Sequence, residues 1–375
     1  MEVKEYELGQ LLSYEQPTPY IVESTKYSEK YKTPVLTAGK SFIIGYTNEE
    51  TGIYNSLPVI IFDDFTTSSQ YVNFKFKVKS SAMKILTANT DLVLPKYIFY
   101  RMQIINFDHS THKRYWIQHY SKLKIQIPTL SEQERIIRKI EELFSELDKG
   151  VETLQTIKQQ LAVYRQAVLK EAFASLPESV KMERIANMID PQPSHRTPPE
   201  EPDGVPYIGI GDIDYSRRII DFENARKVSN DVLQEHLSRY NLHNGDFIMG
   251  KIGTIGKPFR ITLPQSYALS ANVILIQPNE DLIEPRYLFW QFSSSLITKQ
   301  LSAGSNATSQ PAFGIKKARL LSVKICPMEK QRQIVEEIES RLSVCDSIEQ
   351  TVDTALSQAE AMRQSILKKA FEGTL

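Results

Sequence analysis

A nine-residue motif occurs twice in the chain, 198 residues apart, and this repeat strongly limits what the chain can fold into. RQAVLKEAF, residues 165–173, recurs as RQSILKKAF, residues 363–371, with six of nine positions identical. Further identities occur at the same offset without a gap: Gln133 and Gln331, Ile136 and Ile334, Ile140 and Ile338, Glu141 and Glu339, and Asp148 and Asp346. One structural element is therefore used twice.

Each copy of the motif lies in a long segment whose apolar residues follow alternating steps of four and three, which is a heptad pattern typical of coiled coils. In the second segment, the same seam is apolar at every position except Arg341. Ser131 and Glu134 have the spacing of a capping box after Pro128, and Leu176-Pro177 is a stop signal. A helix of about 43 residues would be roughly 65 Å long. Gly150 is the one glycine in this segment and the position where the helix is expected to bend most easily.

The segments that precede the two helices also repeat, though weakly, since PKYIFY at 95–100 matches PRYLFW at 285–290. Strand-like runs bounded by Gly, Pro and Asn occur in both segments, at 57–62, 71–78, 271–276 and 320–325. The fold class predicted is α+β: two mixed α/β domains separated by two long antiparallel coiled-coil helices, with an internal pseudo-twofold repeat. The expected divisions are domain one at 1–127, a spacer helix at 128–176, domain two at 177–326 and a second helix at 327–375. The proline-rich stretch 191–202 is predicted to be a loop of domain two.

Composition excludes several classes of protein. The chain has 45 basic and 45 acidic residues, 41% hydrophobic residues and two cysteines, which excludes collagen-like, disordered and disulfide-scaffold proteins and a four-cysteine zinc site. No signal peptide and no run of 18 apolar residues occurs, so the expected location is cytoplasmic.

Basic charge gathers in two stretches, each just before a helical segment. No carboxylate occurs between Asp108 and Glu132, or from Pro285 to Met328. Their basic residues are Lys113, Arg114, Lys122 and Lys124 in the first stretch, and Arg286, Lys299, Lys316, Lys317, Arg319 and Lys324 in the second. Two matched basic stretches predict two surfaces that contact phosphates, with a solvated rim as the alternative.

Known catalytic and cofactor motifs are missing from the sequence. KIGTIGK at 251–257 lacks the first glycine of a phosphate loop and has Pro258 in place of Ser or Thr; either a close backbone approach at its glycines or a plain hairpin is possible. Adjacent Asp63 and Asp64 favour a structural role over a metal site, because neighbours in a strand point to opposite faces. His109 and His112 lack a third ligand.

Several stretches resemble the specificity subunit of bacterial type I restriction–modification systems. Residues 33–50, 57–86 and 127–137 resemble that family's first target recognition domain and its junction with the central helix, and residues 204–213 and 245–257 are similar to the second. The second junction, CPMEKQRQI at 326–334, departs from the family pattern and is one residue shorter.

The resemblance implies a subunit that is not itself an enzyme, binds double-stranded DNA at a bipartite site and holds no cofactor. Two modification subunits would bind S-adenosylmethionine and methylate adenine N6, and restriction subunits would use ATP and Mg²⁺ to translocate and cleave. Half-sites read by two domains on one face of the duplex would lie about 10 bp apart. The DNA-binding candidates are Lys40, Thr66, Thr67, His112, Lys113, Arg114 and Tyr115 in domain one, and Lys251, Thr254, Lys257, Lys316 and Lys317 in domain two.

Other functions remain open from the sequence. One keeps the family but places the chain in a type IIB-like or orphan methylation system. Another is a coiled-coil adaptor whose domains bind proteins. A third is an enzyme with an unrecognised site around Asp63, Asp64 or Asp212.

Overall fold

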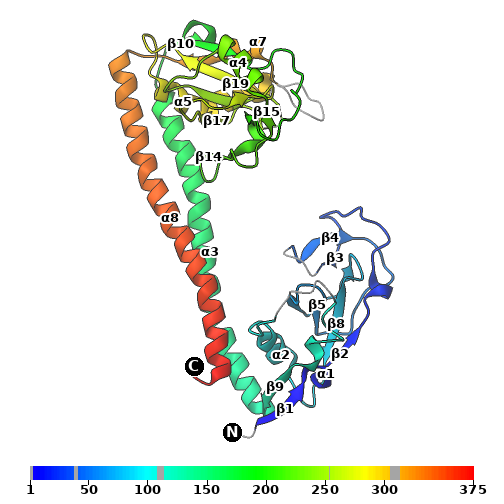
Figure 1. Cartoon of the computed structure of the whole chain (residues 1–375). Helices are drawn as coiled ribbons and strands as arrows, with labels where there is room; N and C mark the ends of the chain where they lie inside the picture. The colour runs from blue at the N-terminus through cyan, green and yellow to red at the C-terminus, as the bar shows by residue number, and fades with distance from the viewer. Residues whose placement is uncertain (1–2, 38–40, 108–113, 253, 305–312) are drawn as a thin grey trace. The chain divides into compact units, whose positions relative to one another are not determined.

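The computed structural model describes residues 3–37, 41–107, 114–252, 254–304 and 313–375 (Figure 1). The chain divides into two compact units, Met1–Gln155 with Asp353–Leu375, and Thr156–Val352. Each unit contains one mixed domain and the adjoining parts of two long helices, α3 (Leu130–Ala174) and α8 (Met328–Glu372). The predicted fold class, with two long helices and two α/β domains, is confirmed.

The start of α3 differs from the predicted capping box. Because β9 (Lys124–Pro128) runs directly into the helix, Thr129 takes the cap position, and its carbonyl accepts hydrogen bonds from the Glu132 and Gln133 amides at 3.0 Å. Ser131 therefore lies inside the first turn, and the predicted Ser131–Glu134 box is wrong.

The two helices run antiparallel within each unit. In the first unit Arg363 of α8 forms an ion pair with Asp148 of α3, and in the second Arg165 of α3 lies 2.7 Å from Asp346 of α8. Arg165 and Arg363 are equivalent in the repeat, as are Asp346 and Asp148. One ion pair thus occurs twice with the roles of the helices exchanged, which confirms the internal pseudo-twofold repeat.

Gly150 does not interrupt α3, and a Cβ added there would meet nothing within 4 Å. We expect Gly150→Ala to raise the free energy of unfolding by about 0.5–1 kcal/mol, because alanine restricts the unfolded backbone and favours the helix. Urea denaturation checks this. Ala162→Gly, at an exposed position of the same helix, is the control and should lower stability by a similar amount. An unchanged or lower stability for Gly150→Ala would contradict the expectation.

The two domains share one strand topology. The first has a four-stranded sheet in the order β2-β8-β5-β6, a three-stranded sheet β4-β3-β7 and the pair β1-β9; the second has β11-β19-β16-β17, β15-β12-β18 and β10-β20 in the same roles. In both three-stranded sheets one pair is parallel, β3 with β7 and β12 with β18. The pair β13-β14 is an addition in the second domain.

The elements of the first domain are β1 (Val3–Glu7), α1 (Leu8–Leu11), β2 (Leu12–Glu15), β3 (Thr33–Leu36), β4 (Ile43–Thr47), β5 (Val59–Asp63), β6 (Ser69–Val72), β7 (Lys77–Val78), β8 (Met83–Ala88), α2 (Pro95–Met102) and β9. Those of the second are β10 (Ser179–Lys181), β11 (Ala186–Ile189), β12 (Val205–Ile208), β13 (Ile213–Asp214), β14 (Ile219–Ile220), β15 (Lys227–Val228), α4 (Asn230–Arg239), β16 (Phe247–Gly250), β17 (Pro258–Arg260), β18 (Ala268–Leu269), β19 (Val273–Pro278), α5 (Pro285–Phe292), α6 (Ser295–Gly304), α7 (Ile315–Arg319) and β20 (Ser322–Lys324). Short 3₁₀ turns lie at Thr18–Tyr20, Tyr120–Lys122, Met182–Arg184 and Ile210–Asp212.

The predicted strand at 71–78 is wrong as a single element. The chain leaves the four-stranded sheet after Val72 and enters the three-stranded sheet at Lys77. Val72, Phe76 and Val78 are all fully buried in one core that also takes Ile61 and Ile85. Crossing between the sheets lets this one segment bury side chains against both.

A buried glutamine joins each domain to the first turn of its helix. The Gln133 side chain accepts a hydrogen bond from the Leu94 amide at 2.8 Å and donates one to the Pro128 carbonyl at 3.0 Å. Its repeat partner Gln331 accepts from the Glu284 amide at 2.9 Å and donates to a carbonyl of the junction before α8 at 2.8 Å. The second junction, which departs from the family pattern in sequence, therefore attaches its helix to its domain in the same way as the first.

The proline-rich stretch 191–202 is a loop, as predicted, and a buried histidine of α4 holds it. His236, 0% exposed, lies with Nε2 2.8 Å from Gln192 Oε1 and Nδ1 2.9 Å from the Tyr240 hydroxyl. The Tyr240 oxygen also accepts the Leu269 amide at 3.2 Å, and its own proton can be donated to a neutral His236 imidazole.

Burial, with the nearby Arg239 guanidinium, lowers the pKa of His236 from 6.5 to about 4. The pKa of His236 is lower in the folded protein than in the unfolded chain, so the unfolded chain binds the proton first as the pH falls. The contribution of neutral His236 to the free energy of unfolding is therefore complete above pH 6.5 and is lost as the pH falls towards 4. We expect the opening free energy of α4, measured by hydrogen exchange, to drop by up to about 3 kcal/mol over this range. His236→Asn is the control and should lose this pH dependence. An equal dependence in both proteins would contradict the assignment.

None of the helices in the described part of the chain has the length and apolar character needed to cross a membrane.

Candidate nucleic-acid interface

In the first domain, the turn after β5 and the segment before β9 are held together by Asp64. This residue is 2% exposed, its Oδ1 accepts the Trp116 amide at 2.8 Å, and its carbonyl accepts the Tyr115 amide at 2.9 Å. Lys84 Nζ, also buried, lies 3.4 Å from Asp64 Oδ2. Asp64 therefore connects two loops that are 52 residues apart in sequence, and the buried ion pair with Lys84 of β8 holds Asp64 in place.

Three of the predicted DNA-binding residues meet at this junction. Asp63 Oδ1 accepts the amides of Phe65 at 2.8 Å and Thr66 at 3.0 Å, which forms the turn that presents Thr66 and Thr67. Thr66 and Arg114 are exposed, and the Arg114 guanidinium lies 6.0 Å from the centre of the Phe65 ring. The cation and two hydroxyls can reach phosphate oxygens or base edges from one place.

Phe65 was not among the predicted contacts. Its ring is 43% exposed in the turn after β5, and nothing in the sequence marked it, because Phe65 follows the apolar run VIIF with only two aspartates between.

The other predicted DNA-binding residues of the first domain are either buried or outside the described residues. Tyr115 is 1% exposed and its ring lies 5.0 Å from that of Phe107, so its predicted DNA contact is wrong: the side chain belongs to the core. Lys40, His112 and Lys113, like His109, lie outside the described residues.

The second domain joins the equivalent loops in the same way. The Phe313 amide donates to the Lys251 carbonyl at 2.9 Å; Phe313 is the repeat partner of Tyr115, and Lys251 follows β16 as Asp64 follows β5. Lys251 is only 7% exposed, with its Nζ 2.6 Å from Asp190 Oδ2. Its predicted DNA contact is therefore wrong, since burial commits the ammonium group to an ion pair. The buried charge after the strand is acidic in one domain and basic in the other.

The hairpin between β16 and β17 carries the exposed candidates Thr254 and Lys257. Lys257 Nζ lies 3.9 Å from the centre of the Tyr215 ring, and the Tyr215 hydroxyl donates to the Lys257 carbonyl at 3.0 Å. Burial raises the pKa of Tyr215 to about 12, which keeps it protonated as a donor. Gly256 has φ +75°, and an added Cβ would stand 1.9 Å from Leu301 Cδ1, so the close approach is to α6. The segment is a hairpin packed on its own domain.

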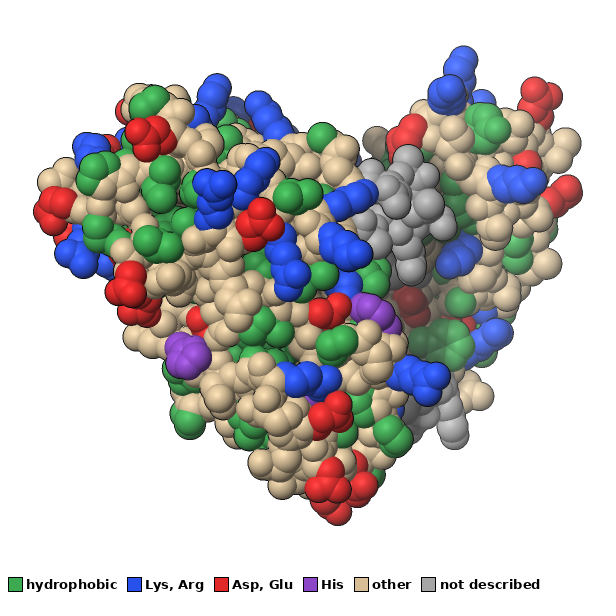
Figure 2. Space-filling view, turned by 90° about the horizontal axis from the view of Figure 1, so that it is seen from above, with side chains coloured by type: hydrophobic (Ala, Val, Ile, Leu, Met, Phe, Trp, Pro, Cys, Tyr) green, Lys and Arg blue, Asp and Glu red, His purple; other side chains and the backbone are tan. Residues whose placement is uncertain are grey.

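Lys316 and Lys317 are exposed on α7. Lys317 Nζ donates to the Gly304 carbonyl at 2.8 Å, and Arg319 donates to the Met188 carbonyl at 3.1 Å. Two of the three cations of this helix therefore also hold the fold. The face drawn in Figure 2 shows lysine and arginine side chains gathered together among scattered acidic ones.

The carboxylates considered for catalysis have structural roles. Asp63 shapes a turn, Asp64 is in the buried pair, and Asp212 Oδ2 accepts the Gly209 amide at 2.7 Å. Within the described ranges, no three His, Cys, Asp or Glu side chains are grouped so that they could hold a metal ion.

Comparisons with known proteins agree with this geometry. Residues 189–358 match the family model described as the type I restriction modification DNA specificity domain. The specificity subunit of the type I restriction enzyme EcoR124I/EcoR124II from Escherichia coli is 43% identical over 181 residues, which cover 45% of each chain. That of EcoBI, also from Escherichia coli, is 25% identical over 291 residues, 69% of this chain and 61% of the relative.

A solved structure from work on complex assembly and conformational transition of the type I R-M system covers 100% of this chain and 98% of its own, with 16% identity and a TM-score of 0.70. This likeness shows the fold, while the two sequence matches span 45% and 61% of the relatives' own lengths. Residues 189–358 therefore match the type I restriction modification DNA specificity domain, and larger parts of the chain are similar to type I specificity subunits.

Proposed function

We propose that the chain is the sequence-specific DNA-binding subunit of a type I restriction–modification system. It recognises a bipartite site in double-stranded DNA and directs modification and restriction subunits to that site. The observation that carries this proposal is the pair of equivalent loop junctions, one in each domain, which share a backbone framework and differ in their exposed side chains.

This division into framework and variable side chains suits sequence recognition. Phosphate contacts position a protein on DNA, and a few side chains read base edges. Thr66, Thr67 and Arg114 would contact one half-site, and Thr254 and Lys257 the other, with Lys316 and Lys317 contacting its phosphates. Because the two sets differ in chemistry, the two half-sites differ in sequence.

The chemistry belongs to the partners in this proposal. The chain itself is not catalytic and holds no cofactor. The modification subunits supply S-adenosylmethionine and methylate adenine, and the restriction subunits supply ATP-driven cleavage with Mg²⁺. The long helices act as the spacer that sets half-site separation near one turn of the duplex, about 10 bp.

Base-modification sequencing of genomic DNA tests the proposal. Cells that carry the chain and its modification subunit are compared with cells that lack only the chain. A bipartite N6-methyladenine motif should be present in the first and absent from the second. Unchanged methylation, or a motif that forms one undivided block, would refute it.

A further inference from the structure

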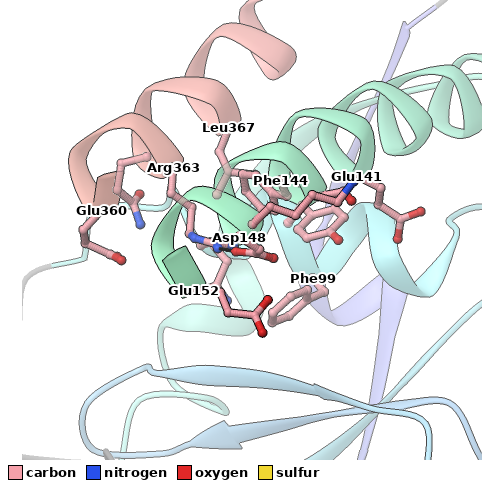
Figure 3. A pocket seen from close by; sticks show the side chains of 13 residues that line it. Phe99, Glu141, Phe144, Asp148, Glu152, Glu360, Arg363 and Leu367 are labelled. Carbon is pink, nitrogen blue, oxygen red and sulfur yellow. Dashed lines mark hydrogen bonds and ion pairs between the residues drawn. The ribbon is translucent and has the colours of Figure 1, made fainter. Parts of the chain in front are cut away.

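The cleft beside the long helices of the first unit does not suit DNA. It has a volume of about 710 Å³, lies between α2, α3 and α8, and is lined by four acidic and two basic side chains. Figure 3 shows the carboxylates of Glu141, Asp148, Glu152 and Glu360 around it. This excess of negative charge would repel phosphates, so the exposed loops of the two domains remain as the source of base contacts.

Phe65 is the exception among the phenylalanines of the chain. All 16 lie within the described residues, and Phe65 alone has an exposed side chain, at 43%. The turn fixes its backbone, because its amide donates to Asp63 Oδ1 at 2.8 Å. The fold therefore holds an apolar ring in water at the place where Thr66 and Arg114 are also exposed, which is unfavourable unless a ligand covers the ring.

The second domain has Ile252 at the equivalent position. The last residues of β5 and β16 pair with Met83 of β8 and Val273 of β19. These two partners are 190 residues apart, which is also the offset between the starts of α2 and α5. Phe65 and Ile252 are each the second residue after these equivalent strand ends, and Ile252 is 39% exposed.

The residue before each of these apolar side chains is buried and fixed in the same way. The Asp64 amide donates to the Ala82 carbonyl at 3.4 Å. The Lys251 amide donates to the Asn272 carbonyl at 2.8 Å. Both carbonyls in turn accept an amide at 2.9 Å, from the segment before β9 and from the one before α7. A single exposed apolar residue is common on protein surfaces, but its recurrence beside the same anchored residue in both domains points to a shared role.

A thymine methyl group is the partner that these side chains fit. It is the one apolar group that the four bases present in the major groove, and apolar side chains recognise thymine by contact with it. Insertion of Phe65 between base pairs would instead require both faces of its ring. One face lies towards the Arg114 guanidinium, and less than half of the side chain is exposed, so contact within the groove is favoured.

We propose that Phe65 and Ile252 are specificity-determining residues, each in contact with the C5-methyl group of one thymine in its own half-site. The inference rests on the proposed function and adds to it one base of each half-site, with the residue that selects this base. The exposed apolar side chains of the free chain become covered when DNA binds.

Duplexes in which deoxyuridine replaces a single thymine test the assignment, because the replacement removes only the methyl group. The complex of the chain with its modification subunit is titrated with the sequenced target by fluorescence anisotropy, and each thymine of the half-sites is replaced in turn. One replacement in each half-site should weaken binding about threefold to fivefold, the effect expected for one buried methyl group.

Variants of the two residues connect each effect to its side chain. Phe65→Ala should bind the thymine and deoxyuridine duplexes equally at the first half-site and still discriminate at the second, and Ile252→Ala should do the reverse. Phe65→Leu keeps an apolar side chain and should keep the discrimination. Val163→Ala, which shortens a side chain that is 71% exposed on α3, is the control and should discriminate at both half-sites.

Discrimination that survives Phe65→Ala or Ile252→Ala, or its loss from both half-sites in one single variant, would overturn the proposal. If the unchanged complex binds the bipartite duplex tightly but is indifferent to every replacement, this inference falls and the proposed function stands. If the unchanged complex does not bind the bipartite duplex, both are wrong.

Discussion

Asp64→Ala is expected to lower the free energy of unfolding of the first domain by about 3–5 kcal/mol, because it leaves a buried ammonium group without its partner. Lys84 is 1% exposed, with Asp64 Oδ2 3.4 Å from its Nζ. The substitution also removes the acceptor of the Trp116 amide, and thereby loosens the segment that carries Arg114. Urea denaturation followed by tryptophan fluorescence in a Trp290→Phe background, which leaves Trp116 as the only tryptophan, measures the change.

A double-mutant cycle separates this ion pair from general damage. Lys84→Met alone should also be strongly destabilising, but the double variant should be more stable than the sum of the single effects predicts, by at least about 2 kcal/mol. Glu132→Ala, which removes the ion pair with Arg135 at the surface of α3, is the control and should have a much smaller effect. Additive effects, or a change below about 1 kcal/mol for Asp64→Ala, would show that the buried pair does not stabilise the first domain.

Lys316→Glu combined with Lys317→Glu is expected to weaken DNA binding at least about tenfold and to reduce the salt dependence of affinity. Each lost phosphate contact lowers the slope of log K against log salt by roughly one, so the slope should fall by about two. Both lysines are exposed on α7, although Lys317 also donates to the Gly304 carbonyl. Fluorescence anisotropy over a range of salt concentrations, on a duplex that carries the sequenced target, measures the slope.

The matched control for this charge reversal is Lys368→Glu with Lys369→Glu, another adjacent pair of exposed lysines, near the end of α8. It changes net charge equally and should leave the slope unchanged. Equal slopes for the α7 variant and the unchanged chain would remove Lys316 and Lys317 from the interface. Equal losses in both variants would mean that only net charge matters.

The sequence predicted the features that depend on local pattern. The 198-residue repeat predicted both long helices, their antiparallel pairing and the twofold relation that Arg165–Asp346 and Arg363–Asp148 display. It also placed candidates in equivalent loops of the two domains, around Thr66 and Lys257. The predictions of the helices and of the repeat succeed because heptad spacing acts over a few neighbouring positions and the pattern occurs twice.

The misplaced residues are those whose environment comes from distant parts of the chain. Lys251 was predicted as a DNA contact from its basic character, but its ion-pair partner Asp190 lies 61 residues earlier. Tyr115 lies in a basic stretch of the sequence, but its side chain packs in the core and its amide donates to the Asp64 carbonyl. The burial of these two side chains depends on contacts with distant segments, which neither the composition nor the periodicity of their own segment indicates.

The sequence by itself therefore determined the repeat, the helices and the family resemblance. Only the tertiary structure decided which cations face solvent, and that the buried charge is acidic in one domain and basic in the other. The physical reason is the range of the interactions: helix formation follows from neighbouring residues, whereas an ion pair, a buried side chain or a cleft requires segments that are brought together only by the complete fold.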